Sequence, residues 1–418
     1  MTDAIKFIDL FSGLGGTRIG LEQACEDLDL DCECVLSSDK KKSAAAAYKK
    51  NFGEDVFPDV VKIDETTMPD FDVLLAGFPC QPFSRAGMKR GFADTRGTMF
   101  FEIERILGAK KPKWVLLENV AELTTNDHGR TLETIIAKLE ALGYGTSWKV
   151  LDGYDFGLAQ SRRRIYIVGI LDQDPLDFGE VEGKPGKVMG DIMETGLPLL
   201  ETPFTKAVLS TYKVKELGGY VISDKRRGPK TMHSWDIASH GKVSADEHAM
   251  METILSEFRK RKWADQLGIK WRDGMPLNLA QICEATGKDK GKVQPILDSL
   301  TAKGYLMKRH PYVDGSLEER YDLPIGWKLV TSRVSFELNR FLGPDDVCVT
   351  LTATDASHIA IIDGKGLRRL STRECLRLFG FPESYSLDGF KDSEVYDLVG
   401  NSICVPVVKA ITKAMLTH

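Results

Sequence analysis

Short, mainly apolar runs alternate with amphipathic helical patterns over the first 170 residues of the chain. The runs Ile5–Leu10, Val73–Ala76 and Trp114–Leu117 each end in a turn of glycine or polar residues. Runs of this kind are typical of strands that are buried on both faces, as in parallel sheets. A chain that repeats strand, turn and helix in this order is expected to form a doubly wound, mostly parallel α/β sheet, with its functional groups where the strands end.

The chain has 418 residues, which is long enough for two domains. No apolar run reaches membrane-spanning length, and the first residues lack the features of a signal peptide. We therefore expect a cytoplasmic protein that does not contact a membrane. The eight cysteines form no Cys-x-x-Cys pair, so we expect neither a disulfide framework nor a metal site.

The net charge of -5 hides three basic runs, Arg162–Arg164, Lys225–Arg227 and Arg259–Lys262. Taken one by one, such runs are more often solvated surface than binding sites. Two of the three lie in the central part of the chain, which favours a contact with a polyanion in that region.

A glycine-rich turn, Phe11–Gly16, separates the first strand from a helical pattern. This arrangement lets the backbone approach a nucleotide-like ligand closely. Arg18 stands where a dinucleotide fingerprint has its third glycine, which favours a nucleoside without phosphates. Asp39 follows the second strand, where it can accept hydrogen bonds from ribose hydroxyls or cap the next helix, and both uses are compatible.

Further strand ends carry chemically useful side chains. Cys80 follows Val73–Ala76 between two prolines and is a candidate nucleophile, although a free cysteine is more often a small buried apolar residue. Glu118 follows the next apolar run, as a site residue or as a helix cap. Strand alternation places Arg162 and Arg164 on one face, where two guanidinium groups suit a phosphate or a carboxylate.

The central residues, 176–345, lack this alternation and are expected to form a separate α+β domain. Within it, residues 277–306 have the pattern of two helices around a glycine-containing turn, followed by a short strand. This pattern resembles a helix-turn-helix with a wing. Pro295 would lie inside the second helix, so a plain helical hairpin fits about as well.

Together these motifs resemble the cytosine-C5 DNA methyltransferase family, of the bacterial restriction-modification type. They occur in the order of that family, and the central stretch matches no motif. The motifs are Asp9–Gly16, Gly77–Ser84, Glu118–Val120, Gln160-x-Arg162-x-Arg164, Arg369–Pro382 and Gly400–Ser402. The resemblance implies a catalytic domain of residues 1–175 and 346–418 with the Rossmann-like fold of S-adenosylmethionine-dependent methyltransferases, and a target-recognition domain of residues 176–345.

The resemblance also implies the reaction, which is methyl transfer from S-adenosyl-L-methionine to C5 of a cytosine in double-stranded DNA. S-adenosyl-L-homocysteine would be the second product. The thiolate of Cys80 would add to C6 of a base that is rotated out of the duplex. Protonated Glu118 would bind N3, Arg164 would bind O2, and Arg162 would orient Glu118.

Two sets of contact residues follow from the same resemblance. Those around the methyl donor would be Phe11, Gly13, Leu14, Gly15, Asp39, Asp59, Val60, Pro79, Met99, Asn401 and Ser402, with Asp64 as a rival to Asp59. Those that contact DNA would be Ser84, Arg85, Lys89 and Arg90 in a lid, with Thr350 and Leu351 near the end of the recognition domain. A winged segment would add Lys and Arg residues of 288–309. We expect a monomer in the bacterial cytoplasm, associated with the nucleoid, that could accompany a restriction endonuclease.

Other classes of protein share some of these features. A transfer-RNA cytosine methyltransferase of the same superfamily would use the same cysteine and donor, but that branch has a much smaller recognition region. A DNA-binding regulator built on an inactive enzyme would have no use for Cys80, Glu118, Arg162 and Arg164 together. A zinc deaminase needs a second cysteine at position 83, which is Phe83, and an NAD-dependent dehydrogenase has no use for the two arginines.

Overall fold

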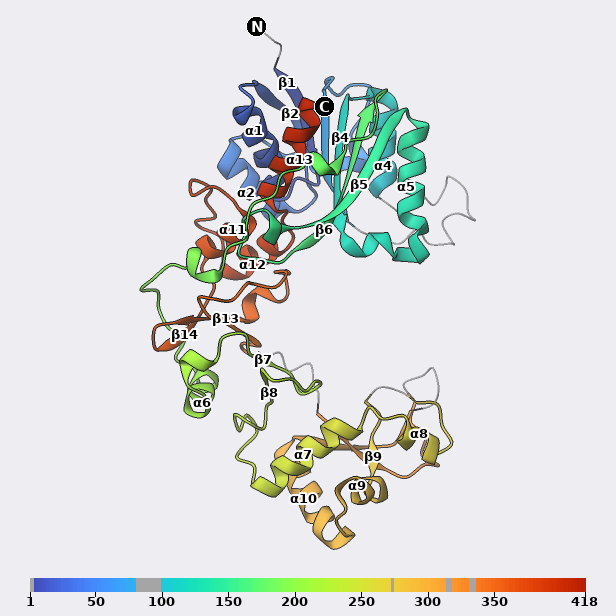
Figure 1. The fold of residues 1–418 in the computed structure, drawn as a ribbon, viewed down its shortest axis with the longest axis vertical. Coiled ribbons are helices and arrows are strands. Elements are labelled where there is room, and N and C mark those ends of the chain that lie inside the picture. The colour runs from blue at the N-terminus through green and yellow to red at the C-terminus, as the bar shows by residue number, and fades with distance from the viewer. Residues whose placement is uncertain (1–3, 80–98, 272–273, 313–317, 331–335) are drawn as a thin grey trace. The chain divides into compact units, whose positions relative to one another are not determined.

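The chain folds into two compact units (Figure 1). The computed structural model describes residues 4–79, 99–271, 274–312, 318–330 and 336–418. Unit 1 is Met1–Glu194, Pro344–Ser357 and Leu370–His418, and unit 2 is Thr195–Gly343 and His358–Arg369.

This division differs in two places from the boundaries expected from sequence. Residues 176–194 lie in unit 1, where the backbone N–H of Met189 donates to the carbonyl of Asp346. Residues 358–369 lie in unit 2, because β13 (Ile359–Asp363) pairs in parallel with β12 (Arg340–Leu342). Both differences arise from pairings between distant segments, which composition cannot reveal.

Unit 1 is built on a six-stranded sheet with the strand order β2-β1-β3-β4-β6-β5. The strands are β1 (Ile5–Leu10), β2 (Cys32–Ser38), β3 (Val73–Gly77), β4 (Trp114–Val120), β5 (Tyr144–Asp152) and β6 (Arg163–Leu171). Five of them run in one direction, and β6 runs against both of its neighbours. The expected doubly wound, mostly parallel α/β sheet is confirmed.

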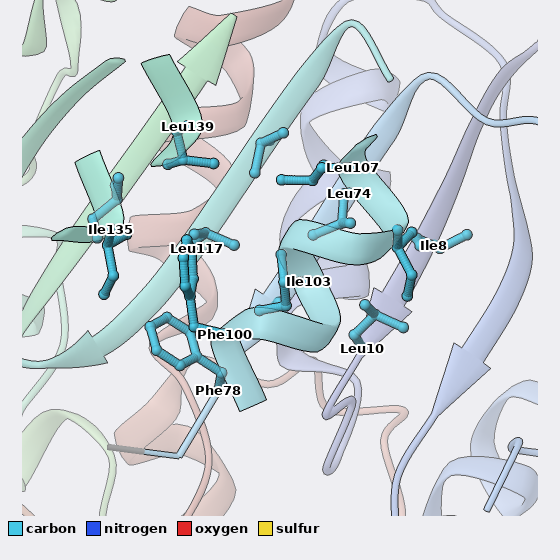
Figure 2. Packing of buried hydrophobic residues seen from close by; sticks show 14 of the residues in the cluster. Ile8, Leu10, Leu74, Phe78, Phe100, Ile103, Leu107, Leu117, Ile135 and Leu139 are labelled. Carbon is cyan, nitrogen blue, oxygen red and sulfur yellow. The ribbon is translucent and has the colours of Figure 1, made fainter. Parts of the chain in front are cut away.

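Helices cover both faces of this sheet. They are α4 (Met99–Lys110) and α5 (Arg130–Ala141) on one face and α1 (Gly16–Asp27) and α13 (Val405–Thr417) on the other. The further helices of unit 1 are α2 (Lys42–Phe52), α11 (Thr372–Phe379) and α12 (Asp392–Gly400). On one face, Ile103 of α4 and Leu139 of α5 pack in a cluster with Leu74 of β3 and Leu117 of β4 (Figure 2). These side chains are fully buried, so Leu74→Ala would leave a cavity and cost about 2–5 kcal/mol.

On the opposite face, α1 lies against α13, which comes from the far end of the chain. The two helices approach closely at Gly20, where a Cβ atom would lie 2.6 Å from Cβ of Val408, so the contact requires glycine. Among the described residues, Asp392–Thr417 is apolar and long enough to be tested as a membrane span. It consists of two separate helices, however, and 72% of its apolar window is buried within the protein, as expected for core helices.

Unit 2 contains a five-stranded sheet with the order β14-β13-β12-β7-β8. Its additional elements are α6 (Pro203–Thr211), β7 (Val221–Ile222), β8 (Thr231–Met232) and β14 (Gly366–Arg369). Val208 of α6, Phe341 of β12 and Leu367 of β14 are fully buried in its core.

The rest of unit 2 is a segment of residues 244–330 with the element order of a winged helix. Its elements are α7 (Ala245–Glu257), α8 (Lys262–Gln266), β9 (Leu277–Asn278), α9 (Leu279–Thr286), α10 (Lys290–Lys303), β10 (Leu306–Arg309) and β11 (Gly326–Leu329). The last two strands and β9 form an antiparallel sheet of order β10-β11-β9. Pro295 lies inside α10, where the helix continues past it. The sheet distinguishes this winged-helix segment from the plain helical hairpin that the sequence left open.

Candidate active site

The topological switch point of the sheet in unit 1 lies between β1 and β3. The chain leaves β1 toward β2 on one side, and the next strand, β3, lies on the other side of β1. In open α/β sheets, ligands bind at such a switch point, outside the carboxyl ends of the strands. The turns that follow β1, β3 and β4 therefore frame the candidate site.

The turn after β1 has the left-handed backbone that its glycines allow. Gly13 has φ +53° and Gly15 has φ +74°, and a Cβ atom on Gly15 would lie 2.5 Å from the Phe52 ring. Phe11 has φ +55°, which is a strained conformation for an aromatic residue. Strain of this kind persists only where the surrounding structure holds it, and it is common at ligand sites.

Asp39 joins this turn to the start of α2. One carboxylate oxygen accepts from the backbone N–H of Gly13 at 2.8 Å, and the other accepts from that of Lys41 at 2.7 Å. Lys41 is the N-cap residue of α2, and no side chain caps the helix there. Asp39 therefore fixes the glycine turn instead of capping α2, and each oxygen keeps a lone pair for a ligand.

Asp59 and Val60 lie on the next loop. The Asp59 carboxylate accepts from the N–H of Val61 at 3.2 Å and lies 3.6 Å from Lys40, the residue after Asp39. The rival Asp64 instead binds the backbone and hydroxyl of a residue in its own exposed turn. Of the two acidic residues, Asp59 is thus the one that lies beside the Asp39 loop.

The end of β3 is held in place by Asn119, which the sequence analysis did not assign as a site residue. Its side-chain amide donates to the carbonyl of Phe78 at 2.9 Å, and only 2% of the residue is exposed. The Phe78 ring packs against Phe100 of α4 at 6.2 Å (Figure 2). These contacts fix the backbone up to Pro79, which is exposed. The expected site residues Cys80, Ser84, Arg85, Lys89 and Arg90 lie outside the described residues.

Glu118 lies at the end of β4, beside Gly77 of β3. Its carboxylate is 3.2 Å from Nε of Arg164, and each of the two side chains is 13% exposed. Burial raises the pKa of Glu118, and the positive charges of Arg164 and Arg162 oppose this shift. The structure therefore brings Glu118 and Arg164 together. At this position the protonated form of Glu118 is more favoured than it would be for a glutamate on the surface.

Arg162 makes its hydrogen bonds elsewhere. Its guanidinium donates to the carbonyls of Leu351 at 2.8 Å, Ser402 at 2.8 Å and Gly400 at 3.2 Å. It is 3% exposed, and burial lowers its pKa to about 10. Arg162 was expected to help orient Glu118. Its hydrogen bonds tie the strand to the turns at Leu351 and at Gly400–Ser402, and its charge also acts on Glu118.

The two DNA-contact residues expected near position 350 also serve this junction. Leu351 is fully buried, and its N–H donates to the side chain of Gln160 at 2.8 Å. The hydroxyl of Thr350 donates to the carbonyl of Ser161 at 2.9 Å. Leu351 thus has no side-chain surface to offer to DNA, and the two residues have a structural use at this junction.

The remaining donor-contact residues fall into buried and exposed groups. Leu14 is 1% exposed, and its carbonyl accepts from the hydroxyl of Tyr385 at 2.8 Å, so only its backbone could approach a ligand. Met99 is the first residue of α4 and packs at the edge of the core. Asn401 is exposed and donates to the carbonyl of Asp397 at 2.8 Å.

Buried polar atoms without partners occur in the same turns. Among the described residues, Oδ2 of Asp9, Oγ of Ser12 and Oγ of Ser402 make no hydrogen bond. Burial raises the pKa of Asp9 to about 7. Such atoms are costly unless a ligand or water completes them, so the turns after β1 and before α13 suit a polar ligand. No group of three potential metal-ligating side chains occurs in the part of the chain that the structure describes.

The fold of the chain is similar to that of solved methyltransferase structures. The structure resembles the Dnmt2 methyltransferase of S. pombe with a TM-score of 0.55 and 18% identity, over 99% of each chain. Similarity at this level of identity defines the fold class, and the switch-point site agrees with it.

The family follows from the sequence comparison. The family model described as C-5 cytosine-specific DNA methylase matches residues 5–417. The chain is 47% identical to the type II methyltransferase M.NlaIV of Neisseria lactamica and 46% identical to M.NgoBV of Neisseria gonorrhoeae, over 99% of each chain in both cases. The chain belongs to the C-5 cytosine-specific DNA methylase family and is a DNA (cytosine-5-)-methyltransferase, as the motifs indicated.

Proposed function

We propose that this enzyme methylates one cytosine within a specific sequence of double-stranded DNA, with S-adenosyl-L-methionine as the donor and a covalent bond to Cys80 during the reaction. The observation that carries the proposal is the partly buried pair of Glu118, near the end of β4, and Arg164 of β6. It lies beside the strand end that leads to Cys80, where an acid and a nucleophile can act on the same ring.

The target carbon C5 is a poor nucleophile until a group adds to C6. The Cys80 thiolate forms a bond to C6, and the electron pair of the C5–C6 double bond becomes available at C5. Negative charge develops toward N3 and O2. Glu118 in its acid form donates to N3, and Arg164 binds O2. Carbon C5 would then form a bond to the methyl group, and the donor sulfur would keep the electron pair of the bond that breaks. Loss of the C5 proton restores the C5–C6 double bond, Cys80 leaves as a thiolate, and N3 returns its proton to Glu118.

The base must leave the duplex to reach this site, at a cost of about a few kcal/mol. We assign the lid for this step to residues 84–97, with Ser84, Arg85, Lys89 and Arg90 as backbone contacts. Asn119 and Arg162 act as positioning residues. Asn119 holds the turn before Cys80, and Arg162 joins β6 to the turns at Leu351 and Ser402.

S-adenosyl-L-methionine would supply a methyl group on a positively charged sulfur. The residues of the β1 and β3 turns fit this ligand, because the glycine turn lacks Cβ atoms and the buried hydroxyls of Ser12 and Ser402 lack partners. In this assignment Phe11 stacks on the adenine, Asp39 accepts from the ribose, and the backbone of Gly13, Leu14 and Gly15 faces the methionine part. The remaining contacts are Asp59, Val60, Pro79, Met99, Asn401 and Ser402.

Unit 2 would read the DNA sequence. It takes the place of the expected recognition domain, with bounds that follow the structure. It contains 27 Lys and Arg residues against 19 Asp and Glu, a net charge of +8, whereas unit 1 has 29 against 42, a net charge of -13. A surplus of positive charge in one unit favours a polyanionic partner there. Protection of host DNA in the cytoplasm, as a monomer beside a restriction endonuclease, is the biological role that we propose.

Bisulfite sequencing of DNA from cells that express the chain tests this function. We expect protection of one cytosine in every copy of a short sequence, and no protection with Cys80→Ser. Purified enzyme should methylate duplex DNA and not transfer RNA. Methyl transfer to transfer RNA alone would contradict the proposal and favour the RNA-acting branch of the superfamily.

A further inference from the structure

The positive charge of unit 2 is unevenly divided. The winged-helix segment, residues 244–330, contains 14 basic and 13 acidic residues, and the rest of the unit contains 13 basic and 6 acidic residues. The surplus therefore belongs to the five-stranded part, although the winged helix is the element whose fold is familiar from DNA-binding proteins.

The cations of the winged-helix segment are largely engaged in ion pairs. Its longest basic run, 259–262, shows this clearly: Lys260 pairs with Glu257 at 2.5 Å, Arg261 lies 3.5 Å from Asp265, and Lys262 lies 3.5 Å from Glu284. Further cations of the segment that pair with acidic residues are Lys288, Lys292, Lys303, Lys308, Arg309 and Arg320.

The loop of residues 225–230, between β7 and β8, is different. We call it the cationic loop. All six residues are exposed, and four of them are Lys or Arg. Arg227 pairs with Glu252 of α7 at 2.8 Å, and the ammonium of Lys230 donates to the carbonyl of Gly218 at 2.6 Å. Lys225 and Arg226 make no ion pair with any residue that the structure describes.

Backbone hydrogen bonds also hold the C-terminal part of the loop. The N–H of Thr231 donates to the carbonyl of Gly228 at 3.1 Å, and the N–H of Val221 donates to the carbonyl of Lys230 at 2.9 Å. The anchored cations Arg227 and Lys230 thus support a turn that presents Lys225 and Arg226 to solvent. Because these contacts restrict the backbone of the turn, the loop loses less conformational entropy when a partner binds these two side chains than an unrestrained loop would lose.

We propose that the cationic loop binds the phosphate backbone of duplex DNA through Lys225 and Arg226, and that it supplies phosphate contacts that the winged-helix run 259–262 does not. This inference rests on the proposed reading of DNA by unit 2 and names the surface that holds the backbone. Two cations on one fixed turn suit neighbouring phosphates, and such contacts strengthen binding without reading the sequence.

The test compares two double variants that remove the same charge. Lys225→Gln with Arg226→Gln alters the cationic loop, and Arg261→Gln with Lys262→Gln alters exposed, ion-paired cations of the winged-helix segment. The Kd for a fluorescent duplex that contains the methylated sequence is measured by anisotropy between about 50 and 200 mM salt. Each lost phosphate contact lowers the slope of log Kd against log salt by about 0.9.

We expect the slope of log Kd against log salt to be lower by about 1.8 in the loop variant, because two phosphate contacts are lost. Over this fourfold range of salt, the Kd of the wild type should therefore rise roughly 12-fold more than the Kd of the variant. The control variant should change the slope by less than about 0.5. The rate at saturating DNA and the bisulfite pattern should be unchanged in both. An unaltered slope in the loop variant, an equal loss in the control, or a changed methylated sequence overturns the inference. Absence of DNA methylation by the wild type would instead overturn the proposed function.

Discussion

Replacing Arg162 by methionine separates a structural role from a catalytic one. Methionine has a similar length but no donor, so the carbonyls of Leu351, Gly400 and Ser402 lose their partner. Hydrogen bonds to a charged group contribute about 1.5–3 kcal/mol each, which gives roughly 5–9 kcal/mol for three. Burial of the charge offsets part of this, because a pKa lowered from 12.5 to about 10 corresponds to about 3 kcal/mol.

The net expectation is a loss of about 4 kcal/mol in the free energy of unfolding of unit 1, or roughly 8–16 °C in its thermal midpoint. The neighbouring Arg163→Met is the matched control, because Arg163 is exposed and should change stability by less than about 0.5 kcal/mol. Differential scanning calorimetry measures both. A midpoint for Arg162→Met within about 2 °C of that of Arg163→Met would refute the reasoning, and would restore the view that Arg162 acts mainly on Glu118.

Three further predictions concern the turns of the site. Glu118→Gln should lower kcat by about 10²–10⁴. The proposed mechanism uses the acid form of Glu118, which burial favours by raising the pKa and which is lost as pH rises. Stopped-flow pH profiles should therefore show an alkaline decline in the wild type that the variant lacks. Folding also takes up a proton at this group, so wild-type stability falls as pH rises from the ordinary carboxyl range through the raised pKa, and urea titrations of the variant should lack that fall. Asn119→Ala should lower kcat about tenfold or more with little change in the Kd for DNA, since it frees the turn before the nucleophile; an unchanged kcat in single-turnover assays would count against that positioning role. Gly15→Ala should weaken donor binding and cost more stability than Gly53→Ala, because both have φ near +75° but only Gly15 lacks space for a Cβ atom; calorimetric titration and melting that gave equal effects would disprove the steric argument.

Local pattern was sufficient for the sheet and for the places where its strands end. The apolar runs before Cys80 and Glu118 identified β3 and β4, and the glycine turn after β1 required the left-handed backbone that Gly13 and Gly15 adopt. These features depend on residues that are adjacent in the chain, so periodicity and turn chemistry predict them.

Long-range partners could not be predicted in this way. The hydrogen-bond acceptors of Arg162 come from turns near 351 and 402, which only the fold brings together, so its role at this junction was not predicted. Leu351 was expected to contact DNA, and its burial depends on partners that are equally distant in the chain. The winged-helix segment stayed ambiguous because β9 has two residues, too few for a strand pattern.

The roles of the basic runs in the central region also depend on residues that are distant in the chain. The runs 225–227 and 259–262 are equally basic in sequence, and nothing local distinguishes them. The structure does so through Asp265 and Glu284, which lie outside the second run and pair with its cations.

The covalent step at Cys80 is the central claim, and a duplex with 5-fluorocytosine at the target position tests it most directly. Fluorine at C5 cannot leave as the proton does, so the bond between sulfur and C6 should persist after methyl transfer. Mass spectrometry of the digested complex is expected to find one nucleotide attached to the peptide that contains Cys80, and none with Cys80→Ser. The absence of an adduct, or an adduct on another side chain, would contradict the account.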